Sequence, residues 1–203
     1  MMKRRKKWIL WGSLALISIP LLYVVAFICF AFFNPFHAHQ HCIKNTGLAL
    51  RMYATDHEGR FPADTNGFGN ALLLLVKGGY LGDTNNTFSV RLVTGPGDDG
   101  AVFTETLRTG ARIPEEKCSR VYVQGLSEEN NPQIAILWDK KSNPGGDHFR
   151  RPWGPLLREV SLLDGSMQVI REKDWPHFAS NQVELLVQAG LDRATANHYY
   201  HIP

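Results

Sequence analysis

The apolar residues of the chain form one long run near the amino terminus, followed by shorter runs with helical or strand periodicity. Residues 8–33 contain no charged side chain. As a helix this run is about 39 Å long, enough to cross a hydrocarbon core of about 30 Å with some tilt. Trp8 and Trp11 at its start are typical of a membrane interface. The pattern predicts a transmembrane helix over residues 8–33.

A cleaved secretory signal peptide is the alternative for this run. The apolar core of a signal peptide usually spans about 7–15 residues and ends at small residues. Here the run is longer, and residues 29–31 (Cys-Phe-Ala) are a poor cleavage site. We therefore expect an uncleaved signal anchor, kinked at Pro20.

Most of the excess positive charge lies at the amino terminus. The remaining chain carries 17 basic and 19 acidic side chains, so we expect no nucleic-acid partner. Basic residues next to a membrane span stay on the cytoplasmic side, which predicts an exported domain after the span. The basic residues that determine this orientation are Lys3, Arg4, Arg5, Lys6 and Lys7.

Two helices are predicted directly after the membrane run. Over residues 38–57 the apolar positions recur at three-to-four spacing and form one face, and Gly59 and Pro62 then end the helix. Residues 68–77 form a short, very apolar run that Gly78 stops. A helix of this length is too short for a second membrane span, so we expect it to be buried in the core.

The rest of the chain reads mainly as strands. An Asp164-Gly165 pair between two apolar runs is a strong hairpin signal. Helix-like segments at 102–109 and 183–189 each end at a glycine. Consecutive antiparallel strands with helices segregated to one side imply an α+β domain with a C-terminal helix. The expected strands are 88–93, 120–124, 133–138, 159–163 and 167–171.

These expectations divide the chain into a cytoplasmic basic tip (1–7), a transmembrane helix (8–33) and an exported α+β domain (34–203). In that domain the helix that continues from the membrane packs on a small antiparallel sheet. The lipid bilayer is therefore the first expected partner.

The order of several short motifs resembles that of a known family. The first motif lies in the second half of the predicted helix 38–57 and in the residues just after it. A Gly-Tyr-Leu sequence at 79–81 follows the apolar helix 68–77, and the Asp164-Gly165 hairpin comes last. The chain resembles the type II secretion major pseudopilins and the pilin-like proteins of planctomycete and verrucomicrobial bacteria. The first motif consists of Ala49, Leu50, Tyr53, Asp56, Gly59, Phe61 and Pro62.

This resemblance implies a pilin-like fold and a single-pass protein of the bacterial cytoplasmic membrane, with its C-terminal domain in the periplasm. It implies a non-enzymatic structural or interaction role, accessory to a type II secretion or pilus system, with other envelope or secretion-system proteins as partners. The chain lacks the prepilin processing motif, in which glycine precedes Phe-Thr-Leu-x-Glu. We therefore expect no cleavage by the prepilin peptidase.

The densest group of ligand-type residues lies between His37 and Cys42. On a helix His37 and His41 are one turn apart, a spacing that can hold one metal ion, whereas an extended chain places His37, His39 and His41 on one face. Histidines at a membrane boundary without a ligand are the alternative. The corresponding second function is a membrane-tethered exported enzyme or metal-binding protein.

Cys42 and Cys118 are both predicted to lie outside the membrane, where disulfides persist. The two form a candidate disulfide, with a pair of small buried thiols as the alternative. The chain contains no G-x-S-x-G, S-x-x-K or H-E-x-x-H motif and no phosphate-binding glycine loop. We therefore assign no catalytic residue and no cofactor.

Overall fold

The computed structural model describes residues 18, 20–26, 36–81, 108–118, 120–144 and 155–201, with only the backbone for 36–42 and 143–144. The chain divides into two compact units, Met1–Phe36 and His37–Pro203. In the first unit, residues 20–26 are helical and the side chains of residues 21–25 are exposed. Within the described ranges, no helix is long and apolar enough to cross a membrane. Most of the predicted span 8–33 lies outside those ranges.

Both predicted helices after the membrane run are present. Helix α2 (Phe36–Asp56) buries the face that the periodicity indicated, including Ile43 and Leu50. It ends where Gly59 adopts a left-handed φ of 76° and its N–H donates to Ala54 O at 2.8 Å. Helix α3 (Phe68–Lys77) has the predicted bounds and is largely buried, as expected of a core helix.

A five-stranded antiparallel sheet forms the centre of the second unit. Strand β4 pairs with β5 on one side and with β2 and β3 on the other, and β1 pairs with β2. The predicted hairpin joins β4 to β5, with Gly165 at φ 84° donating its N–H to Leu162 O. The strands are β1 (Arg120–Tyr122), β2 (Ala135–Asp139), β3 (Asn143–Pro144), β4 (Leu156–Leu162) and β5 (Met167–Arg171). The expected strand 88–93 lies outside the described residues.

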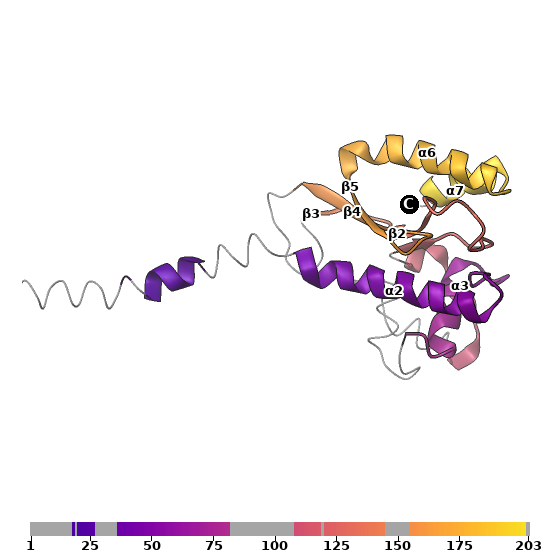
Figure 1. Ribbon diagram of the computed structural model, residues 1–203, viewed down its shortest axis with the longest axis horizontal. Coiled ribbons are helices and arrows are strands. Elements are labelled where there is room, and N and C mark those ends of the chain that lie inside the picture. Colours follow the sequence, from indigo (N-terminus) through magenta and orange to yellow (C-terminus); the bar gives the residue numbers. More distant parts are fainter. Residues whose placement is uncertain are drawn as a thin grey trace, which may run out of the picture. The chain divides into compact units, whose positions relative to one another are not determined.

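Helices cover both faces of this sheet (Figure 1). Helix α2 approaches one face, where Gly47 contacts Ser161 of β4. Helices α6 (Trp175–Gln188) and α7 (Arg193–His201) cover the other face. The expectation that helices lie on one side only was therefore wrong. The reason is visible in β2, whose five residues are all buried, as in a strand that is covered on both faces.

The C-terminal region is more helical than the sequence indicated. The helix expected over 183–189 begins at Trp175, and α7 was not predicted at all. Two signals identify these helices in retrospect. Pro176 occupies the first turn of α6, and Asp192 accepts the Thr195 N–H at the start of α7. The class is α+β, with a mixed set of helices and a small antiparallel sheet.

Candidate functional site

The histidine cluster lies at the start of α2. Because α2 begins at Phe36, the backbone places His37 and His41 one helical turn apart, the first of the two arrangements considered from the sequence. Their side chains lie outside the described residues, so the metal site stays a prediction. Among the side chains that are described, no group of three or more His, Cys, Asp or Glu residues is arranged to hold a metal ion.

Cys118 is buried just before β1. Its Sγ lies so close to α3 that a methyl group on Gly69 would meet it at 3.0 Å. The Cys42 side chain lies outside the described residues, although its backbone belongs to α2. The distance between the two sulfur atoms is therefore not defined by the described residues, and the disulfide stays a prediction.

A row of buried charged side chains crosses the sheet, and sequence reasoning did not find it. Arg120 of β1 faces Asp139 of β2 across the strands, with Nε 3.4 Å from Oδ1 and only 1% of the Arg120 side chain exposed. The β2–β4 register continues the row to Glu159, which is also buried. A guanidinium stays protonated, so it neutralises charge that would otherwise be costly to bury.

The neighbouring charged side chains have structural hydrogen bonds. Buried Lys140, directly after β2, donates from Nζ to Glu115 O at 2.8 Å. Together with the Arg120–Asp139 pair, this contact fixes the register of β1 on β2 and ties the sheet to the segment before it. Nothing in the sequence pattern pointed to this row, because its members are about 20 residues apart and only strand register aligns them.

A second ion pair lies on the face of the sheet that α6 covers. Arg158 of β4 donates from Nε and Nη2 to the two carboxylate oxygens of Glu172 at 2.8 and 2.9 Å. Its guanidinium lies 4.5 Å from the ring centroid of Trp175 and also donates to Lys140 O. Hydrogen bonding to Arg158 lowers the pKa of Glu172. The contact joins β4, the end of β2 and the start of α6.

An aromatic and acidic cluster lies where α2 ends. The rings of Tyr53 and His57 stack at 3.7 Å, and Tyr80 meets Tyr53 edge-on at 5.5 Å. Tyr80 donates its hydroxyl to Asp56 Oδ2 at 2.8 Å, and this hydrogen bond raises the Tyr80 pKa. Two separate motifs of the resemblance, one ending α2 and one following α3, therefore meet in space.

The remaining residues of the first motif also have structural contacts. Phe61 donates its N–H to Leu126 O at 3.1 Å, and Pro62 O accepts the Tyr122 hydroxyl at 2.8 Å. These contacts hold the segment after α2 against the end of β1. The geometry of the motif residues is that of a scaffold that fixes helix and sheet to each other.

Comparison of the chain with protein-family models, with curated proteins and with solved structures found no match.

Proposed function

We propose that this chain is a membrane-anchored, exported, pilin-like interaction protein, accessory to a type II secretion or pilus system. The support comes from the motif order in the sequence and from a helix, α2, that follows the apolar run and packs on an antiparallel sheet. In this proposal the amino-terminal tip is cytoplasmic, the C-terminal domain is periplasmic, and the chemistry is recognition without catalysis.

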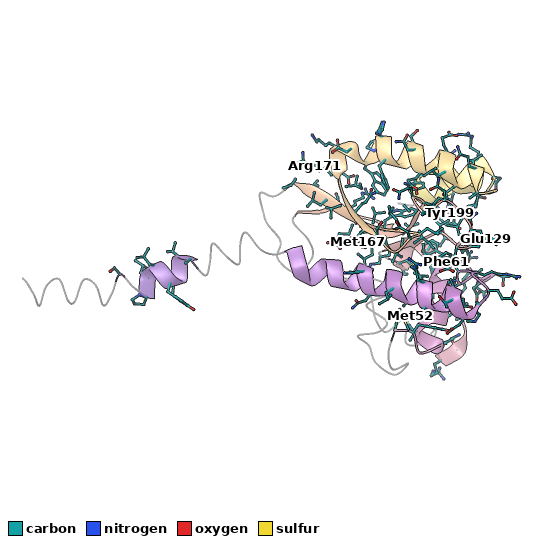
Figure 2. The ribbon with its side chains drawn as sticks, in the orientation of Figure 1. Met52, Phe61, Glu129, Met167, Arg171 and Tyr199 are labelled. Atoms are coloured by element: carbon teal, nitrogen blue, oxygen red, sulfur yellow. The ribbon has the colours of Figure 1, made fainter. Side chains whose placement is uncertain are left out.

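The observation that carries the proposal is the distribution of exposed apolar side chains in the described part of the chain. Seven of the nine large ones lie on helical segments before the sheet: residues 21–25, and Leu48 and Met52 of α2. Leu48 and Met52 are one turn apart and 59% and 48% exposed. Met52 lies on the side of α2 away from the sheet (Figure 2). Exposed apolar surface of this kind marks contact with lipid or with another helix.

Two measurements test this proposal. Protease treatment of spheroplasts should digest the C-terminal domain and leave the amino-terminal tip in the membrane; a C-terminal domain that is shielded in intact spheroplasts contradicts the topology.

The second measurement is co-purification after cross-linking in membranes. Pilin-like or secretion-system subunits should accompany the wild-type chain and be lost from a Leu48→Ser/Met52→Ser variant. The control is Asn45→Ser/Thr55→Ser, which alters exposed polar positions of the same helix. Equal recovery from all three chains contradicts a role for the apolar positions.

A further inference from the structure

The direction of α2 relative to the sheet defines which end of the sheet lies beside the start of α2. Gly47 contacts Ser161, and one turn later Arg51 donates to Asp164 O, so α2 and β4 run in the same direction. The start of β4 and the end of β5 therefore lie toward the start of α2, as Figure 1 shows. Figure 2 places Arg171 at this end and Met167 farther along the sheet.

The surface at this end combines an apolar floor with cations. A pocket of about 480 Å³ is lined by Pro155, Leu156 and the segment from Arg171 to Lys173. Leu156 is 47% exposed although it is a large apolar side chain. Leu156 and Pro155 form the apolar part of this surface.

The charges around this pocket are mainly positive. Glu172 is engaged by Arg158, so its carboxylate is already neutralised. Arg171 and Lys173 are exposed and form no ion pair within the described part of the chain. Lys141 is a further exposed cation after β2, and Asp174 is an exposed carboxylate next to Lys173.

We infer that this surface, made by Leu156, Arg171 and Lys173, docks onto the anionic phospholipid headgroups of the membrane that anchors the chain. The inference rests on the proposed membrane anchor. Only three residue steps connect Phe33, the last of the apolar run, to the start of α2 at Phe36. They reach roughly 10 Å even when fully extended. The start of α2, and with it this surface, is therefore held close to the headgroups.

The chemistry of the surface fits a headgroup layer. Arginine and lysine contact lipid phosphates, and each cation near an anionic surface raises local binding about fivefold. Leucine and proline at the same level suit the boundary between headgroups and acyl chains. The short tether keeps the surface at high local concentration near the lipid, so weak contacts suffice.

The test uses the full chain in lipid nanodiscs of phosphatidylcholine, with and without added phosphatidylglycerol. Lysine modification by a water-soluble amine reagent is read by mass spectrometry. Modification of Lys173 should fall about fivefold or more in the anionic discs at low salt and recover at high salt. Lys77, exposed at the end of α3, is the internal reference and should not change.

Variants separate this surface from general attraction of a charged chain. Arg171→Gln should reduce the protection of Lys173, whereas Arg60→Gln, which removes an exposed arginine beyond the end of α2, should leave it intact. Equal Lys173 modification in both kinds of disc, with the chain retained in them, overturns the docking surface and leaves the anchor standing. Loss of the chain from the discs overturns the anchor and this inference together. Protection that appears in detergent micelles and rises with protein concentration assigns the surface to a second copy, and also overturns the inference.

Discussion

Two buried tyrosine hydroxyls in the described core have different surroundings. Tyr122 donates to Pro62 O at 2.8 Å. Tyr200 stacks on Trp138 with ring centroids 4.5 Å apart, and its hydroxyl has no hydrogen-bond partner among the described residues. Burial raises the pKa of both hydroxyls well above the usual value. The pair separates the effect of burial from the effect of a hydrogen bond.

We predict that Tyr122→Phe lowers the free energy of unfolding by about 1–2 kcal/mol, because it leaves Pro62 O without its donor. Tyr200→Phe should leave the free energy unchanged or raise it slightly, because it removes a hydroxyl that gains nothing from burial. Urea unfolding of the full chain in detergent, followed by circular dichroism, measures both. Equal destabilisation by the two substitutions contradicts the assignment.

The same tyrosines predict sensitivity to alkali. Because the pKa of both tyrosines is higher in the folded state, the free energy of unfolding keeps its full value below the unfolded tyrosine pKa of about 10. It decreases as the pH rises above that value, since the unfolded state then loses the tyrosine protons first. Unfolding free energy should therefore fall steeply above about pH 10. Tyr200→Phe should make that fall shallower, and an unchanged slope contradicts the role of Tyr200.

At the scale of elements, the separation of α2 from the sheet depends on one glycine. A Cβ built on Gly47 would overlap Ser161 Oγ but would lie at an ordinary 3.5 Å from Ser161 Cβ. The helix therefore approaches β4 through the space that the missing side chain leaves. The steric conflict is with a single hydroxyl, which makes it reversible by a second substitution.

We predict that Gly47→Ala destabilises the domain by about 1–3 kcal/mol through overpacking. Ser161→Ala alone should be nearly neutral, and the double variant Gly47→Ala/Ser161→Ala should recover most of the loss. A double-mutant cycle of unfolding free energies measures the coupling. Additive effects of the two substitutions would show that α2 is held by other contacts.

The contact between Arg158 and Glu172 joins three elements and predicts a dependence on acid. The Glu172 pKa is lowered in the folded state, so its stabilisation is present above the unfolded value of about 4.3 and is lost as the pH falls through the folded value. Glu172→Gln should remove this part of the acid dependence. Arg158→Lys should reduce it too, because lysine cannot bind both carboxylate oxygens in a planar fork. Unfolding free energies at neutral and acid pH test both variants.

The sequence was informative where one local pattern decides the outcome. The buried face of α2, the bounds of α3 and the Asp-Gly hairpin follow from periodicity and turn chemistry. The bulge in β2 does not follow from periodicity or turn chemistry. The backbone there is bound by one side chain, because Gln182 of α6 accepts from Ala135 N–H and donates to Gln133 O. That contact spans nearly 50 residues, and no local pattern encodes it. The same holds for the ionic row between Arg120 and Glu159.

At the scale of the whole molecule, a disulfide would tie the start of α2 to the segment before β1. The loop that Cys42 and Cys118 would close contains about 76 residues, for which the chain-entropy model gives about 4 kcal/mol. The sequence suggests this pair only through the cysteine count and the predicted location of both residues outside the membrane. It carries no information on the distance between the two sulfur atoms.

We predict that the wild-type chain migrates faster than Cys118→Ser on non-reducing electrophoresis and that a reducing agent removes the difference. Cys29→Ser is the matched control, because Cys29 lies in the predicted membrane run and should leave the mobility unchanged. Identical mobility of the wild-type and Cys118→Ser chains excludes the bridge.

The order of the described strands has a consequence for how the molecule is made. Among them, β1 pairs with β2, β2 with β4 and β4 with β5, so the main sheet neighbours follow one another along the chain. Local pairings of this kind close short loops and form quickly. A chain delivered amino end first can therefore assemble this sheet strand by strand during its synthesis. Helix α2 acquires its full packing surface only after β4 has emerged, so its apolar face stays uncovered through most of the delivery.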